Sequence, residues 1–181
     1  CLSPYAESKW ENEKQVKRVK KQGLNAIALR FFNVYGPGQG ALGGYASVIP
    51  KFIHMMASGT PPSILGTGLQ TRDFVHVRDV ANAILLLLEH SKPFEHTVAN
   101  VCSQTESSIL NLVEIINQSL ISEGLNKSPL LPIFQPSREG DIVRSVGNNN
   151  RLRSIINWDA EVQFEDGILE LVKQHDRGRG R

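Results

Sequence analysis

Tyr5 and Lys9 stand four residues apart near the start of the chain, and this pairing of residue types could transfer a proton. On a helix, residues at positions i and i+4 lie on the same face, one turn apart. The ordinary pKa of tyrosine is near 10, so a phenolate base at neutral pH requires a pKa lower by about 3, or roughly 4 kcal/mol of preferential stabilisation of the anion. The Lys9 ammonium group and a positively charged ring nearby could together supply it. The same spacing occurs by chance on many surface helices, so its surroundings must decide.

The element that must position this pair is a predicted helix that ends near Gly23. Ser3 and Pro4 resemble an N-cap followed by proline at the first helical position, and apolar residues then recur on one face. Residues 26–32 form an almost continuous apolar run, which predicts a strand buried on both faces, as in parallel sheets. Residues 33–38 predict the loop that ends this strand.

Strands and helices alternate along the rest of the chain. Such alternation predicts an α/β layer structure with parallel strands and right-handed crossovers. Residues 125–150 are rich in Pro, Ser, Asn and Gly and are expected to form long loops around a site. The hydrophobic periodicity predicts strands over 72–77 and 97–101 and helices over 46–57, 77–88, 109–120 and 164–172. Ser107 and Ser108 are candidate caps of the 109–120 helix.

Composition and charge exclude several classes of protein. The 20 Lys and Arg residues nearly balance the 18 Asp and Glu residues, which gives no reason to expect a nucleic-acid or membrane surface. The Arg/Gly run over 177–181 is interpreted as a solvated tail. Cys1 and Cys102 make neither a disulfide framework nor a zinc spacing, so we expect a cytoplasmic protein without a metal site. The apolar run over 83–88 is far shorter than the roughly 20 residues of a membrane span.

Three motifs follow one another in order: SPYAESK at 3–9, ALRFFNVYGPG at 28–38 and RDFVHVRDVA at 72–81. Together with shorter matches at 99–101, 108–112 and 138–141, the series resembles the extended short-chain dehydrogenase/reductase family, and within it the NAD-dependent nucleotide-sugar epimerases of the UDP-glucose/UDP-N-acetylglucosamine 4-epimerase type. The resemblance covers nearly the whole chain. It implies the C-terminal portion of a Rossmann-type doubly wound parallel sheet plus a smaller α/β substrate-binding domain.

The resemblance implies where an NAD cofactor would bind. Tyr5 would be the catalytic acid/base, and Lys9 would hydrogen-bond the nicotinamide ribose and lower the pKa of Tyr5. The backbone at Phe31 and Phe32 would lie beside the nicotinamide ring.

The resemblance also implies contacts for a UDP-sugar substrate. Asn33 would face the diphosphate at the carboxyl end of its strand, where open α/β sheets bind ligands, unless it simply forms a turn. Arg72 and Arg138 match arginines that clamp the diphosphate and ribose, although isolated arginines are more often surface ion-pair residues. Asp141 would bind the ribose or orient Arg138.

Other candidates have an equally good structural explanation. Val48, Ile49 and Phe52 resemble the segment that closes over the nucleotide base, but a helix core explains them equally well. Asp73 is expected to cap the helix that begins near residue 77, and His76 to be a satisfied, partly buried imidazole, so neither is assigned to the site.

The chain is expected to be a fragment of a longer enzyme. Residues 1–36 would form the tail of the NAD-binding domain and residues 37–181 the nucleotide-sugar-binding part, with about 72–104 returning to the NAD-binding domain. The family's glycine-rich phosphate loop and catalytic Ser or Thr have no counterpart, and the chain starts at Cys1. Since nothing holds the NAD pyrophosphate, the chain by itself is not expected to turn over.

The expected activity is that of a UDP-hexose or UDP-N-acetylhexosamine 4-epimerase acting through a transient 4-keto sugar. A 4,6-dehydratase or decarboxylase of the same family would share the Tyr and Lys, and a non-catalytic nucleotide-sugar-binding module is the alternative from another class. The first helix carries Trp10, Val16 and Val19, which could be buried against a second copy in a homodimer.

Overall fold

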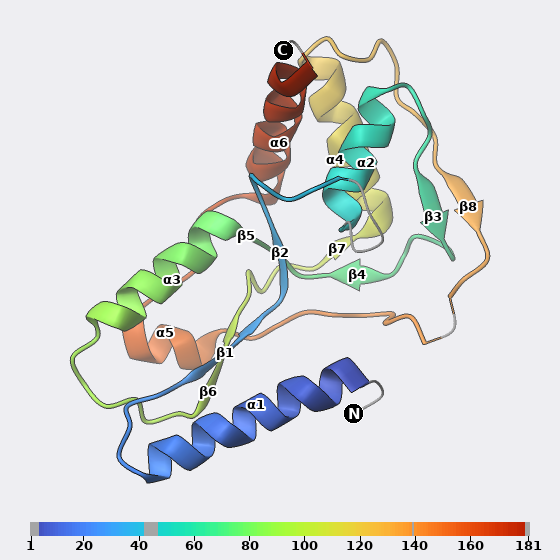
Figure 1. The fold of residues 1–181 in the computed structure, drawn as a ribbon. Helices are drawn as coiled ribbons and strands as arrows, with labels where there is room; N and C mark the ends of the chain where they lie inside the picture. Colours follow the sequence, from blue (N-terminus) through green and yellow to red (C-terminus); the bar gives the residue numbers. More distant parts are fainter. Residues whose placement is uncertain (1–3, 42–46, 139, 180–181) are drawn as a thin grey trace.

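The computed structural model describes residues 4–41, 47–138 and 140–179 (Figure 1). The predicted N-cap at Ser3 and the predicted helix start at Ala46 lie outside the described residues. The helices are α1 (Pro4–Lys21), α2 (Val48–Ala57), α3 (Val77–Glu89), α4 (Ile109–Ser122), α5 (Asn150–Ile156) and α6 (Phe164–Arg179). The strands are β1 (Ala28–Phe31), β2 (Asn33–Tyr35), β3 (Ser63–Leu65), β4 (Thr71–Arg72), β5 (Phe74–His76), β6 (Val98–Val101), β7 (Ser107–Ser108) and β8 (Ile133–Gln135).

Parallel pairing predominates among the strands, which confirms the predicted α/β class. β1 pairs with β6, β2 with β5 and β3 with β8, all parallel, whereas β4 and β7 are antiparallel. The chain changes partner between β1 and β2, because Phe32 N donates to Val101 O at 3.1 Å and Asn33 N donates to Asp73 O at 3.0 Å. Residues 33–35, predicted as a loop, are therefore a strand whose partner lies too far along the chain for local periodicity to reveal.

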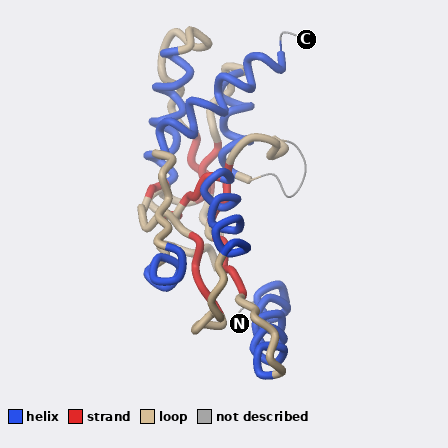
Figure 2. Tube along the Cα trace, turned by 90° about the vertical axis from the view of Figure 1, so that its left-hand side faces the viewer, coloured by secondary structure: helices blue, strands red, loops and turns tan. Residues whose placement is uncertain are grey.

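Two hydrophobic cores meet along the strands. The first gathers the apolar faces of α2, α4 and α6, with Tyr35 and Phe74 at its edge. The second lies among α3, α5 and β6 and includes Val75 and Trp158. Because successive side chains of a strand point to opposite faces, the neighbours Phe74 and Val75 belong to different cores. Figures 1 and 2 show the helices of the first core gathered at one end of the molecule and α1 at the other.

Helix α4 shows how the predicted periodicity produces the first core. Leu112, Ile116 and Leu120 recur at four-residue spacing and are fully buried. Each such burial contributes roughly 1.5–3 kcal/mol relative to exposure. Ser108, a predicted cap, begins the helix by accepting a hydrogen bond from Asn111 N at 3.0 Å.

Residues 125–150, expected as long loops, include a strand. Ile133–Gln135 form β8 alongside β3, although all three side chains are exposed. Their run is too short to show a period, so the prediction missed it. The short helix α5 then runs from Asn150 to Ile156 and is followed by its C-cap Asn157, which adopts the left-handed conformation with φ of 49°.

Candidate active site

Tyr5 and Lys9 lie on the same face of α1, as their spacing predicts. The Lys9 Nζ is 5.4 Å from the centre of the Tyr5 ring. Both side chains line a groove of about 570 Å³ between α1 and β1, with Phe31 on the strand side. Tyr5 is 71% exposed, so its phenol is open to a ligand that enters the groove. A proton-transferring group and a cation therefore border an apolar and aromatic surface.

Polar side chains tie α1 to the rest of the molecule. The Arg30 guanidinium donates to both carboxylate oxygens of Glu13, at 2.6 and 2.8 Å, and holds the pKa of Glu13 below its usual range. Lys20 Nζ donates to the backbone oxygens of Phe94 and His96. Among residues 4–21 no side chain is fully buried. Charged contacts, rather than a hydrophobic core, thus position the Tyr–Lys pair.

The two phenylalanines assigned to the cofactor point to different places. Phe31 is 49% exposed and lines the groove with Tyr5. Phe32 is half-buried and packs against Gly147, where an added Cβ would lie 2.8 Å from Phe32 Cζ. The structure therefore brings only the Phe31 side chain to Tyr5, and a contact of the Phe32 backbone with the cofactor stays a prediction.

Arg72 anchors a second polar cluster. Its Nη2 donates to Asp141 Oδ1 at 2.7 Å, and its Nη1 donates to the carbonyls of Ile142 at 2.5 Å and Thr71 at 2.8 Å. The Arg72 side chain is 17% exposed. A guanidinium has five donors in a rigid fork, so one that is fixed in this way can still present N–H groups to an anion.

Arg138 and Asp141 line a groove of about 480 Å³ whose apolar wall includes Leu65 and Val143. Asp141 was expected to bind a ribose or to orient Arg138. The second alternative needs correction, because the Asp141 carboxylate forms its ion pair with Arg72, which comes from a distant part of the chain. Sequence proximity favoured the wrong arginine.

Asn33 begins β2 and lies in register with Phe74. The alternative of a turn-forming Asn is therefore wrong, and the side chain is exposed. The hydrogen bond from Asn33 N to Asp73 O places Asn33 beside Asp73, the residue between Arg72 at the end of β4 and the start of β5.

The structure favours the core explanation for two of the three candidates in α2. Ile49 and Phe52 are only 1% and 3% exposed and belong to the first hydrophobic core. They have almost no surface left for a ligand. Val48 is half-buried and packs against the same core.

Asp73 and His76 have roles other than those expected. His76, not Asp73, caps α3, because its Nδ1 accepts from Arg78 N at 3.2 Å. The His76 ring is fully buried, and its Nε2 lies 3.6 Å from Glu170 Oε2. Burial, together with the Arg78 charge, lowers the pKa of His76, although Glu170 and Asp79 oppose the shift. The motif reveals these residue types but not which side chain turns toward the helix.

Asp73 is fully buried, and its carboxylate accepts hydrogen bonds from Ser103, Gln104 and Gly147. The sequence did not reveal this role because two of the three donor residues, Gln104 and Gly147, donate only their backbone N–H groups, which do not depend on residue type.

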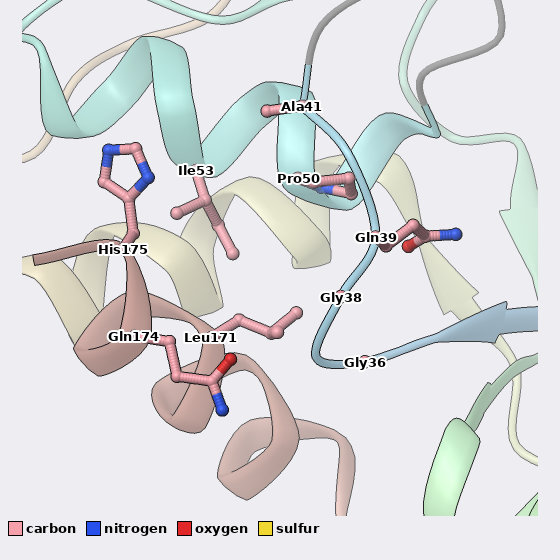
Figure 3. A pocket seen from close by; sticks show the side chains of 9 residues that line it. All are labelled: Gly36, Gly38, Gln39, Ala41, Pro50, Ile53, Leu171, Gln174 and His175. Atoms are coloured by element: carbon pink, nitrogen blue, oxygen red, sulfur yellow. The ribbon is translucent and has the colours of Figure 1, made fainter. Parts of the chain in front are cut away.

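A smaller cavity of about 190 Å³ lies between the loop after β2, α2 and α6 (Figure 3). Gly36 and Gly38 form the loop side, and Leu171 points toward them from α6. This cavity shares no lining residue with the grooves at Tyr5 and Arg138, so it is separate from the candidate site.

Residues 1–102, more than half of the 181, match the NAD dependent epimerase/dehydratase family. The chain belongs to this family. A solved UDP-N-acetylglucosamine 4-epimerase from Methanobrevibacter ruminantium, in complex with UDP-N-acetylmuramic acid, is similar with a TM-score of 0.87 and 35% identity, covering 98% of this chain and 55% of that one.

Two curated family members show the range of activities among relatives. The UDP-glucose 4-epimerase of Mycolicibacterium smegmatis is 31% identical over 172 residues, which is 94% of this chain and 52% of that protein. The dTDP-D-glucose 4,6-dehydratase of Bos taurus is also 31% identical, over 174 residues that make up 94% of this chain and 47% of that protein. The chain thus spans about half the length of the relatives it matches.

Family membership confirms the predicted fold class and the NAD cofactor. The groove between α1 and β1 fits the nicotinamide end of NAD, because Leu29 and Phe31 offer an apolar wall while Tyr5 and Lys9 offer a hydroxyl and an ammonium group. Within the described ranges, no helix is long and apolar enough to cross a membrane. Nor do the described residues contain a group of three or more His, Cys, Asp or Glu that could hold a metal ion.

Proposed function

We propose that this chain carries the proton-transfer and nucleotide-sugar groups of an NAD-dependent UDP-sugar 4-epimerase. The observation that carries the proposal is the shared groove, in which the Tyr5 phenol and the Lys9 ammonium group stand together beside Phe31. Similarity to 4-epimerases from two organisms supports the same assignment.

Tyr5 is placed to move the proton of a sugar hydroxyl. Its phenolic oxygen would take the proton from the hydroxyl on C4 and return it after the 4-keto sugar has rotated to present its other face. When bound, NAD would supply a reversible acceptor for the hydride that leaves C4 of the sugar. Tyr5 therefore acts as base in one half of the reaction and as acid in the other.

The cluster at Arg72 would hold the nucleotide. Arg72 and Arg138 are permanently charged forks suited to a diphosphate, and Arg138 is exposed beside the groove. The Asp141 carboxylate fixes the Arg72 guanidinium. Asn33 would contribute an amide to the diphosphate, and Val48 would lie near the base. Ile49 and Phe52 would support this end of the site from the core.

A second candidate is a nucleotide-sugar 4,6-dehydratase or decarboxylase. It is favoured by the Bos taurus dehydratase, whose identity to this chain equals that of the M. smegmatis epimerase. The same Tyr–Lys pair would begin that reaction, so these two residues do not discriminate between the activities. A non-catalytic nucleotide-sugar-binding module would use the Arg72 cluster alone.

The test is an assay of the natural protein that contains this chain, incubated with UDP-glucose and with UDP-N-acetylglucosamine. We expect interconversion with the C4 epimer, and we expect Tyr5→Phe to abolish it. Formation of a 4-keto-6-deoxy sugar would instead assign a dehydratase. UDP-sugar binding without any turnover would leave only the binding module.

The proposal extends to organisation and assembly. We propose that residues 1–36 and about 72–104 belong with an NAD-binding domain whose pyrophosphate site lies elsewhere in the natural protein, and that the rest binds the nucleotide sugar.

Trp10 is 49% exposed on α1 and could be buried in a homodimer. Light scattering of the natural protein tests this, and a monomer would refute it. We also propose a cytoplasmic location, which the free, buried thiol of Cys102 supports.

A further inference from the structure

We propose that Asp73 is a positioning residue that fixes the nucleotide-sugar side of the site; this inference rests on the proposed function. Asp73 follows Arg72 directly and has 0% of its surface exposed. It does not line the grooves at Tyr5 or Arg138, so it acts through its neighbours. A buried carboxylate without partners would be costly, so its hydrogen bonds show what it holds.

The Asp73 carboxylate joins two segments that are distant in sequence. Its Oδ1 accepts from both Ser103 N and Ser103 Oγ, each at 2.8 Å. Its Oδ2 accepts from Gln104 N at 3.1 Å and from Gly147 N at 3.0 Å. Both oxygens are thereby used, and the loop after β6 is fastened to the segment around residue 147.

The joined backbone is held in conformations that need support. Gln104 has a φ of 63°, which is uncommon for a residue with a side chain. At Gly147 an added Cβ would lie 2.5 Å from Cys102 Sγ, so only glycine permits this approach. The bonds to Asp73 therefore fix a closely packed junction.

This junction is one end of a segment that runs back to the nucleotide side. We call residues 141–147 the return segment. Ser145 N donates to Thr71 O at 3.2 Å, and Thr71 N donates to Val143 O at 2.9 Å. At the other end the segment carries Asp141, which pairs with Arg72. The return segment is thus fastened by Arg72 at one end and by Asp73 at the other.

The backbone of Asp73 adds a third connection, because its carbonyl accepts from Asn33 N at 3.0 Å. Arg72 and Asn33 are proposed to contact the substrate, and Asp141 fixes Arg72; each of the three is bonded to Asp73 or belongs or is bonded to the segment that Asp73 holds. Weakening the hydrogen bonds of the Asp73 carboxylate should therefore shift the nucleotide contacts without changing the groove at Tyr5.

Asp73→Asn is the sharpest change, because it keeps the size of the side chain. Asn has one acceptor oxygen and turns an NH₂ group toward N–H donors, so at least one bond becomes a donor facing a donor. Asp79→Asn is the matched control. Asp79 lies in the same motif, is 5% exposed, and accepts from Glu161 N and Val162 N, both at 3.2 Å, away from the return segment.

The experiment measures hydrogen exchange and UDP binding by calorimetry in the natural protein, for wild type, Asp73→Asn and Asp79→Asn. Loss of a hydrogen bond to a charged group predicts roughly 10-fold weaker UDP binding and at least 10-fold faster exchange at 103, 104 and 141–147 for Asp73→Asn. KM for the UDP-sugar should rise while kcat changes by less than about threefold. Asp79→Asn should leave the UDP affinity unchanged.

Equal weakening of UDP binding by the two variants would reduce Asp73 to a structural role and overturn the proposal. So would unchanged UDP affinity in Asp73→Asn. If the wild type itself does not bind UDP, the proposed function fails, and the exchange rates of 141–147 alone decide whether Asp73 positions the segment. Should Asp73→Asn fail to fold, Ser103→Ala removes a single donor and should weaken UDP binding in the same direction, by about two- to threefold. No change in Ser103→Ala would then count against the proposal.

Discussion

The two halves of the candidate site are built in opposite ways. The groove at Tyr5 and Lys9 is open, and α1 has no buried side chain among residues 4–21. The cluster at Arg72 rests on a buried carboxylate and joins strands to a segment distant in sequence. The proposed reactive groups thus stand on an exposed helix, whereas the proposed nucleotide contacts lie on several segments that are fixed together. Substitutions should therefore separate turnover from nucleotide binding.

The largest separation is expected from Tyr5→Phe. Loss of a positioned acid/base lowers kcat by about 10²–10⁴-fold, while UDP binding should not change because the groove at Tyr5 shares no lining residue with the groove at Arg138 and Asp141. Steady-state kinetics and calorimetry on the natural protein measure both quantities. Lys17→Ala, on the exposed surface of the same helix, is the control and should behave like wild type. A parallel loss of UDP affinity in Tyr5→Phe would mean that the two regions are not independent.

Arg72→Lys should give the opposite pattern. Lysine keeps the charge but cannot contact Asp141 and the Ile142 carbonyl with one planar fork, so we expect UDP to bind about 10–100-fold more weakly. The control is Arg78→Lys, because Arg78 forms an ion pair with Glu170 but its side chain is 64% exposed. If both variants retain full UDP affinity, the nucleotide does not use this cluster.

The sequence predicted the longer helices well because their signals are local. The pattern at 109–120 fixed the buried face of α4, and the i, i+4 spacing placed Lys9 over the Tyr5 ring. Ser108 was recognised as a cap because the residues on either side define its role.

The contacts between distant segments could not be predicted in the same way. One of the two roles expected of Asp141 was to orient Arg138, three residues earlier, but its carboxylate pairs with Arg72 across the fold. Asp73 was expected to cap a nearby helix, yet its partners include Gly147. These contacts depend on tertiary proximity and on backbone N–H groups, which every residue type except proline provides. The residues of the nucleotide side are therefore proposed from the resemblance, but their partners in the fold could not be predicted from it.

Gly147→Ala tests how closely the nucleotide side is packed. The new methyl group would meet Cys102 Sγ at 2.5 Å and Phe32 Cζ at 2.8 Å, and overpacking of this kind destabilises a protein by about 1–3 kcal/mol. Urea denaturation measures the loss. Gly40→Ala is the control, since nothing lies within 4 Å of a Cβ there. Equal stability of the two variants would show that the return segment can move away without cost.

Mild acid is expected to have the smallest effect, a loss of stability on the nucleotide side only. α1 contains no histidine, whereas His76 ends the strand β5 that follows Asp73. Burial, together with the charge of Arg78, lowers the pKa of His76 against the opposing Glu170 and Asp79. The folded protein thus binds this proton less readily than the unfolded chain, whose histidine pKa is near 6.5. The contribution of His76 to stability is therefore complete above that pH and is lost as the pH falls through the folded pKa.

The matched variant for this effect is His76→Asn, because the Asn side chain can still accept the bond from Arg78 N that begins α3. Urea denaturation at pH 7.5 and 5.5 should show a smaller loss of unfolding free energy for His76→Asn than for wild type. Protonation at Nδ1 would also remove the acceptor for Arg78 N, so amide exchange in the first turn of α3 should accelerate in acid while α1 is unaffected. Identical pH profiles for the two proteins would assign the acid sensitivity to other groups and remove this difference between the regions.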